Sequence, residues 1–149
     1  MSKTGHILTG LALAAVAYHC APKAPAIAGA AIVGALLPDA AEGVVGWWGE
    51  ARMSIIPHRT LTHWLYLYVA VIFAAHRFAP MTQEILIGLC AGALLHIALD
   101  AFSPMGIPLG SPFGERTSIG GGSLYHTGTL SELPLLLGVA LIAAAFFIL

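Results

Sequence analysis

The distribution of apolar residues is the feature that most constrains the fold of this chain. Five apolar segments fall at about residues 5–21, 25–38, 61–79, 84–101 and 133–149. The whole chain is 58% hydrophobic and only 9% charged, whereas soluble domains carry about 25% charged residues. So few polar side chains cannot cover a globule in water. The pattern predicts an all-α, multi-pass helical bundle that forms a single integral membrane domain over residues 1–149.

Prolines predict how the apolar segments are connected. Pro22 and Pro25 bracket the connection between the first two segments, and Pro80 ends the third, so both connections are short. We therefore expect two helical hairpins followed by a C-terminal helix. The first two segments are shorter than the roughly 20 residues of a comfortable span, so the first hairpin is either tilted or incompletely spanning. Thr82 is placed to cap the fourth segment.

Counting the crossings predicts which polar residues share a side of the membrane. If every segment crosses, the N-terminus and the connections 39–60 and 102–132 lie together, opposite 22–24, 80–83 and the C-terminus. The first side then holds the basic residues Lys3, Arg52, Arg59 and Arg116, and the second holds Lys23 and Arg77. The positive-inside rule makes the first side cytoplasmic. Most acidic and histidine side chains fall on that same side.

Two histidine-containing stretches carry the chemistry on this side. His96 and Asp100 are four residues apart at the end of the fourth segment, so a helix presents them on one face. Ionisable pairs at such positions in membrane helices point to function, although a structural His–Asp pair is the alternative. His58 and His63 are five apart, and we expect His58 in a loop and His63 in the first turn that follows, with Thr60 or Thr62 as the cap.

Six residues offer metal ligands on the predicted cytoplasmic side: His6, Asp39, His58, His63, His96 and Asp100. Mixed imidazole and carboxylate ligands suit Zn²⁺, and also Mn²⁺ or Fe²⁺. Six ligands exceed the need of one four-coordinate ion, so we expect one to three ions or a ligand set with supporting partners. The chemistry is activation of water and stabilisation of charge on a carbonyl or phosphoryl oxygen.

Further polar residues are candidates for catalytic roles beside the metal ligands. Asp39, Glu42 or Glu132 could act as general base, and Arg59 or Arg116 could hold an anionic group. Glu132 also fits the N-terminus of the last helix, where Ser131 is the expected cap.

Several motifs together resemble one known family. They are Thr4-Gly5-His6, Leu36-Leu37-Pro38-Asp39, His58-Arg59-Thr60-Leu61-Thr62-His63, and His96-Ile97-Ala98-Leu99-Asp100 followed by Ser103-Pro104-Met105-Gly106-Ile107-Pro108-Leu109. In this order they resemble the membrane-bound, predicted metal-dependent hydrolases that include LexA-regulated bacterial inner-membrane proteins. The pattern is more distantly similar to zinc-dependent phospholipase C and to single-strand nucleases of that fold.

The resemblance implies a multi-pass inner-membrane protein with a metal site at the cytoplasmic face. The distant likeness further implies cleavage of a phosphoester or ester by a metal cluster. A site at the membrane face predicts membrane lipid as partner and a lipid-like substrate. The net charge of −1 and the absence of a basic run disfavour nucleic acid. Glu132 stands where family members often carry a late glutamate. The family motif usually reads Pro-Asp-x-Asp, but here Ala41 occupies the second Asp position and Glu42 follows it. Either Glu42 substitutes for that carboxylate, or one ligand is missing.

Two other functions are compatible with the same residues. In a metal-ion transporter, intramembrane His and Asp residues mark an ion path. In a structural membrane protein, the metal stabilises the fold, and chelation unfolds it. The clustering of the candidate ligands on one side favours the hydrolase over the transporter.

Overall fold

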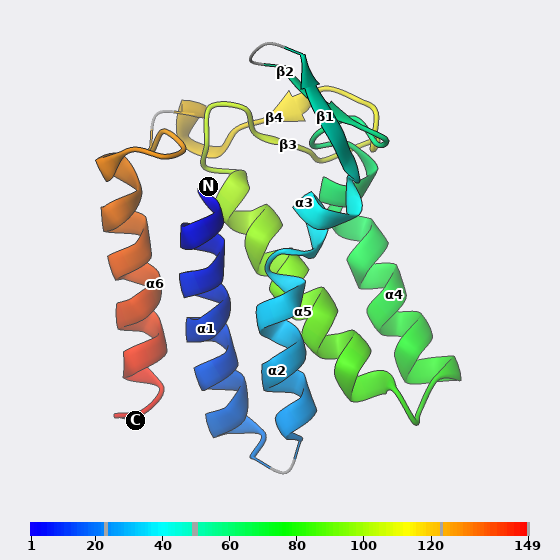
Figure 1. Cartoon of the computed structure of the whole chain (residues 1–149). Helices are drawn as coiled ribbons and strands as arrows, with labels where there is room; N and C mark the ends of the chain where they lie inside the picture. Colours follow the sequence, from blue (N-terminus) through cyan, green and yellow to red (C-terminus); the bar gives the residue numbers. More distant parts are fainter. Residues whose placement is uncertain (23, 49–50, 123, 149) are drawn as a thin grey trace.

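A row of helices with irregular segments gathered at one end makes up this protein (Figure 1). The computed structural model describes residues 1–22, 24–48, 51–122 and 124–148. In Figure 1 the N-terminus and the short strands lie at the upper end, and the C-terminus lies at the lower end. The upper end therefore collects the connections that the crossing count assigned to one side.

The first hairpin consists of α1 (Lys3–Cys20) and α2 (Pro25–Gly34). Ser2 caps α1, because its side chain accepts a hydrogen bond from the backbone N–H of Gly5. Pro25 stands at the first position of α2, where its missing N–H and fixed φ are tolerated. The predicted tight connection between the two helices is confirmed.

The second hairpin consists of α4 (Leu65–Phe78) and α5 (Gln83–Asp100), and α6 (Leu133–Ala145) follows as the C-terminal helix. Apolar side chains of α4 and α5 form a buried cluster that includes Tyr68, Cys90, Ala93 and Ile97. Since α5 also packs along α2, it is the central helix of the bundle. By contrast, none of the residues of α6 is buried.

The expectation of an all-α chain is corrected at the upper end. The connection 39–60 contains an antiparallel hairpin of β1 (Val44–Trp48) and β2 (Ala51–Ser54). The connection 102–132 contains a second pair, β3 (Ile107–Pro108) with β4 (Arg116–Thr117), and two short 3₁₀ turns, η2 (Ile119–Gly122) and η3 (Leu130–Glu132). The described residues are nevertheless mainly helical.

The second apolar segment, 25–38, breaks earlier than predicted. The helix expected to continue to Pro38 ends at Gly34, and a separate short helix, α3 (Leu37–Ala41), follows. Pro38 lacks a backbone N–H, so it fits the first turn of α3 and not the interior of a longer helix.

Close contact between α2 and α5 depends on glycine. A Cβ atom added to Gly34 would lie 2.1 Å from the carbonyl oxygen of Leu89, and one added to Gly92 would lie 2.1 Å from that of Ala31. Neither distance is sterically allowed, so the two backbones approach as closely as they do because both positions lack a side chain. The carboxyl end of α2 is thereby held against α5.

The predicted caps are in part wrong. Thr82 precedes α5 as expected, but its side chain makes no capping hydrogen bond. Thr60 donates to the carbonyl of Pro57 instead of capping, and Thr62 donates to Glu42. The Ser131 hydroxyl accepts from the N–H of His126, and Thr129 caps η3.

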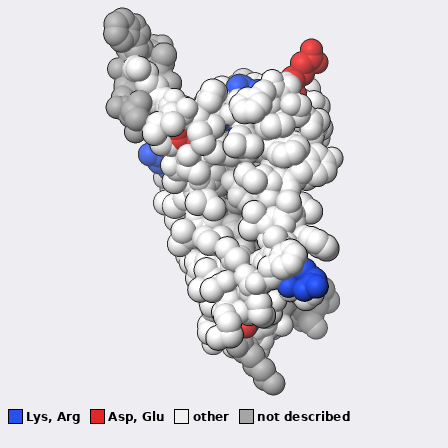
Figure 2. Space-filling view, turned by 90° about the vertical axis from the view of Figure 1, so that its right-hand side faces the viewer, with Lys and Arg blue, Asp and Glu red and all other residues white. Residues whose placement is uncertain are grey.

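Length and composition allow one helix in the described residues, Gln83–Asp100, to cross a membrane, and 44% of that segment is buried inside the protein. Pro25–Gly34, Leu65–Phe78 and Leu130–Ala145 are shorter apolar helices. Large apolar side chains are nevertheless exposed along the outer helices, among them Leu11, Phe73 and Leu141. On the face shown in Figure 2, the charged side chains lie toward the two ends and leave the middle uncharged. Exposed apolar surface of this extent marks a site of contact with membrane or protein.

Part of the charge count cannot be compared with this fold. Lys23 and Glu50, and the side chain of Arg52, lie outside the described residues.

Candidate metal centre

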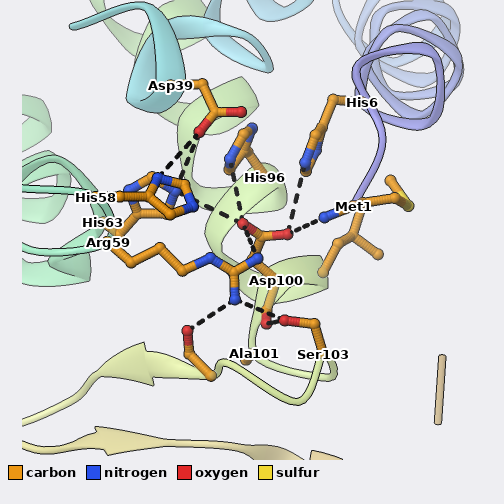
Figure 3. A network of polar contacts seen from close by, with 12 residues as sticks. Met1, His6, Asp39, His58, Arg59, His63, His96, Asp100, Ala101 and Ser103 are labelled. Atoms are coloured by element: carbon orange, nitrogen blue, oxygen red, sulfur yellow. Dashed lines mark hydrogen bonds and ion pairs between the residues drawn. The ribbon is translucent and has the colours of Figure 1, made fainter. Parts of the chain in front are cut away.

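The histidines and carboxylates predicted from the sequence lie close together in one cluster (Figure 3). His6 comes from the first turn of α1, and Asp39 comes from α3. His58 lies in the turn after β2, as expected, and His63 lies in the 3₁₀ turn η1 (Leu61–His63) just before α4. His96 and Asp100 come from the last turns of α5.

A hydrogen bond from one ring nitrogen fixes the orientation of His96. Its Nδ1 lies 2.7 Å from the carbonyl oxygen of Ala35 at the end of α2. A carbonyl only accepts, so Nδ1 carries the proton and Nε2 presents a lone pair in the neutral ring. That Nε2 is buried and has no hydrogen-bond partner among the described residues.

Glu42 orients His58 and lies close to His63, whose Nδ1 is hydrogen-bonded to the Thr62 hydroxyl at 3.1 Å. Its carboxylate oxygens lie 2.8 and 2.9 Å from Nδ1 of His58, and one of them lies 3.3 Å from Nδ1 of His63. Both rings therefore turn their Nε2 atoms away from Glu42. Such carboxylate–histidine pairs fix the tautomer and position of metal-binding rings.

Glu42 is itself enclosed by hydrogen-bond donors. It is fully buried, and the backbone N–H of Arg59 and the hydroxyl of Thr62 donate to it at 3.0 and 3.4 Å. Burial by itself raises the pKa of a carboxyl, but the hydrogen bonds from His58 and Arg59 outweigh it and hold the pKa of Glu42 below its ordinary value. Glu42 is thus an ionised acceptor beneath the two rings. Its carboxylate lies one residue beyond Ala41, where the family motif carries an aspartate.

His6 completes the set of histidines by stacking. Its ring lies parallel to that of His96, with centroids 3.6 Å apart and an interplanar angle of 9°. Two positively charged imidazolium rings at this distance would repel each other. Burial also lowers the pKa of His63 below its ordinary value, which keeps that ring neutral at neutral pH.

Three imidazole nitrogens converge on the carboxylate of Asp100. Nε2 of His6 lies 3.6 Å from Oδ1, and the Nε2 atoms of His63 and His96 lie 3.6 and 3.5 Å from Oδ2. All three nitrogens are buried without a hydrogen-bond partner among the described residues. Each unsatisfied polar group costs about 1–3 kcal/mol, and lone pairs that face a carboxylate add repulsion. A cation among these atoms removes both costs.

Arg59 balances part of the negative charge at the end of α5. Its Nη2 lies 2.8 Å from Oδ2 of Asp100, while Nη1 donates to Ser103 Oγ at 2.6 Å and to the Gly106 carbonyl at 3.0 Å. The α-amino group of Met1 also contacts Asp100. Because a carboxylate at a helix C-terminus is opposed by the helix dipole, these cations stabilise it. Arg59 adopts φ 54°, a left-handed conformation that is uncommon for a residue with a side chain.

An open cleft reaches the cluster from outside. It has a volume of about 370 Å³ and is lined by Asp39, His58, Arg59 and Asp100 on one side and by the segment Ser103–Met105 on another. Asp39 and His58 are the more accessible members, with side-chain exposures of 23% and 31%, whereas His63 and Asp100 are at most 2% exposed. Asp39 Oδ1 lies 3.7 Å from Nε2 of His63. Ligands that are buried at the back and open in front suit a metal site that admits water.

All six predicted ligands fall into three overlapping groups that could hold an ion. These groups are His6, His96 and Asp100; Asp39, His63 and His96; and Asp39, Glu42 and His58. Within each group the ligand atoms lie within 4.8 Å of one another. The donor set of neutral imidazoles and carboxylates fits Zn²⁺, Mn²⁺ or Fe²⁺.

Two residues expected near the chemistry have other contacts. Glu132 is bonded to Ser2 and Gly128 and belongs to none of the three groups. Arg116 donates to the carbonyl of His58 at 2.8 Å. The sequence reasoning did not identify the supporting roles of the Ala35 carbonyl and of Ser103. Ser103 stands three residues after Asp100, and this spacing was the available signal.

Comparison with known proteins places the chain beside membrane proteins. The family model described as YdjM inner membrane protein matches residues 1–148. The chain is 31% identical over 155 residues to "Uncharacterized protein YvsG" from Bacillus subtilis (strain 168), an alignment that covers 99% of this chain and 94% of that protein. No solved structure matches.

Proposed function

This chain belongs to the YdjM inner membrane protein family, and on that premise we propose that it is a membrane-embedded, metal-dependent hydrolase. Its substrate is a phosphoester or ester of a lipid-like molecule, cleaved by water at the cytoplasmic face. The helices form a multi-pass bundle, and the shorter ones tilt or span incompletely. The convergence of three unpartnered Nε2 atoms on Asp100 is the observation that carries the proposal.

The buried residues hold the metal, and the residues of the cleft act on the substrate. His6, His63, His96 and Asp100 are the inner ligands, with Asp39 and His58 toward the opening. When bound, Zn²⁺ would lower the pKa of a coordinated water molecule and polarise the substrate oxygen. Asp39 lines the cleft and is the group best placed to take a proton from the attacking water.

The remaining candidates act by orientation. Glu42 fixes the rings of His58 and His63, and its buried oxygens are already held by donors. The two terminal nitrogens of the Arg59 guanidinium contact Asp100, Ser103 and Gly106. Arg59 therefore neutralises and positions the Asp100 carboxylate. This arrangement replaces the expected role of Arg59 as the anchor of a substrate anion.

A lipid-like substrate is supported by the surface around the cleft. Met105 lines the cleft and is 48% exposed. Leu109 and Phe113, further along the same connection, are 38% and 71% exposed. Apolar side chains at a site mouth favour an amphiphile whose polar group enters while its chains stay outside. Free anionic metabolites would not require such a rim.

The proposal is tested by metal analysis followed by turnover. Detergent-purified wild type should contain roughly one to three equivalents of zinc or manganese by inductively coupled plasma mass spectrometry. His63→Ala should lose the metal, whereas His76→Ala, on the exposed surface of α4, should keep it. Wild type should then hydrolyse phospholipid vesicles or a chromogenic phosphodiester, and a chelator should stop the reaction. Absence of bound metal after supply of zinc and manganese would refute the proposal.

A stabilising metal site is the second candidate, because the ligands join four separate elements. α1, α3, η1 and α5 each contribute at least one of them. In that case metal is bound and its removal unfolds the protein, but no vesicle or phosphodiester is cleaved. The transporter hypothesis has less support, since the grouped ligands lie at one end of the bundle and do not follow a path across it.

A further inference from the structure

Glu132 forms a buried junction between the start of α1 and the start of α6. It stands at the start of α6 and is 5% exposed. Its Oε1 accepts from the backbone N–H of Ser2 and of Gly128, both at 2.8 Å, and its Oε2 accepts from the Ser2 hydroxyl at 2.6 Å. Hydrogen bonds to an ionised carboxylate are about twice as strong as neutral ones. Residues 2 and 132 are thus held together directly.

Ser2 passes this restraint into the first turn of α1. The same hydroxyl that donates to Glu132 accepts from the N–H of Gly5 at 3.2 Å. The carbonyl of Ser2 accepts from the N–H of His6 at 3.0 Å. The backbone of His6 is therefore two hydrogen bonds away from Glu132.

His6 depends on this backbone restraint more than the other histidines do. His58, His63 and His96 each have a ring nitrogen held by Glu42, Thr62 or a carbonyl. Neither ring nitrogen of His6 has a hydrogen-bond partner in the described part of the chain. The position of the His6 ring beside Asp100 and His96 is therefore set by the backbone at the start of α1. Apolar packing of α1 is not directional, whereas the bonds to Glu132 are.

We propose that Glu132 is a positioning residue that holds His6 in the metal centre by clamping Ser2 to the start of α6. This inference rests on the proposed metal site and assigns Glu132 no contact with metal or substrate. It also gives α6 a role, because a helix without buried residues contributes through this junction to a site on other helices.

Coupling between Glu132 and His6 is the test. Zinc affinity of the detergent-purified protein is measured by chelator competition for wild type, Glu132→Ala, His6→Ala and the double variant. Loss of a residue that orients a ligand typically lowers affinity by about 10- to 100-fold. We expect Glu132→Ala to lower zinc affinity by this factor in the otherwise wild-type protein. In the His6→Ala background it should lower zinc affinity little further. Ser131→Ala, which alters the same turn without touching Ser2, should bind zinc as wild type does.

Hydrogen exchange of the first turn supplies a measurement that needs no metal. Glu132→Ala should speed exchange at the amides of Gly5 and His6, while Ser131→Ala should not. If wild type binds no metal, the proposed function fails. Hydrogen exchange alone then tests whether Glu132 restrains the first turn of α1. Unchanged exchange, an equal loss of affinity with and without His6, or lost hydrolysis at unchanged affinity would each overturn the positioning role.

Discussion

His96 donates its Nδ1 proton to the carbonyl of Ala35 over 2.7 Å, and this bond joins the end of α2 to a histidine ring of α5. The bond exists because Gly34 and Gly92 allow the two backbones to touch nearby. The orientation of the His96 ring therefore depends on the close packing of α2 against α5. Predictions about the site follow from both.

Gly92→Ala should destabilise the protein and weaken metal binding. The added methyl group would lie 2.1 Å from the Ala31 carbonyl, so α2 and α5 must separate. Overpacking of this kind costs about 1–3 kcal/mol, and the separation moves the acceptor of His96. Thermal unfolding in detergent and zinc titration measure the two effects. Gly138→Ala on α6, where no atom lies within 4 Å of the added methyl group, is the control and should unfold at the same temperature or higher.

Glu42→Gln should lower zinc affinity by about 10- to 100-fold while leaving the protein folded. The neutral amide removes the ionised acceptor that faces Nδ1 of both His58 and His63. Chelator competition measures the change, and circular dichroism reports whether the helices persist. Glu115→Gln, at an exposed position, is the matched control. Equal affinities for the two variants would mean that Glu42 does not orient the rings.

Arg59→Met should destabilise the metal-free protein by about 3–5 kcal/mol, because Asp100 stays buried after losing its guanidinium partner. Zinc should restore more stability to this variant than to wild type, since the bound cation replaces the lost charge. Unfolding temperatures with chelator and with zinc give the comparison. A zinc-induced shift no larger than that of wild type would argue against the pairing of Arg59 with the metal-binding carboxylate.

Zinc at 100 times its dissociation constant should raise the free energy of unfolding by about 2.7 kcal/mol. The bound metal stabilises only the folded state, in which the ligands of α1, α3, η1 and α5 are assembled. Unfolding temperature against zinc concentration measures this effect. His96→Ala should show a much smaller shift, and His19→Ala, at the exposed end of α1, should respond as wild type does.

Apolar runs and prolines predicted the helices well. α1, α4, α5 and α6 begin and end close to the segments expected from the sequence, because an apolar run and the breakers at its ends, such as Pro22 and Pro80, are local features of the sequence. The spacing of His96 and Asp100 predicted their contact for the same reason. The early end of α2 was missed because its close packing depends on α5, a distant part of the chain. The hairpin of β1 and β2 was missed because strand propensity is a weaker and more context-dependent signal than an apolar run.

The sequence by itself determined which residues could bind a metal and at which end of the bundle they gather. Only the tertiary structure decided how each ring is turned, that Glu42 supports His58 and His63, and that Glu132 binds Ser2 across 130 positions of the chain. The physical reason is the range of the interactions. Helices are specified within a few residues, whereas a hydrogen bond that orients a ligand requires two segments whose meeting depends on the packing of the whole bundle.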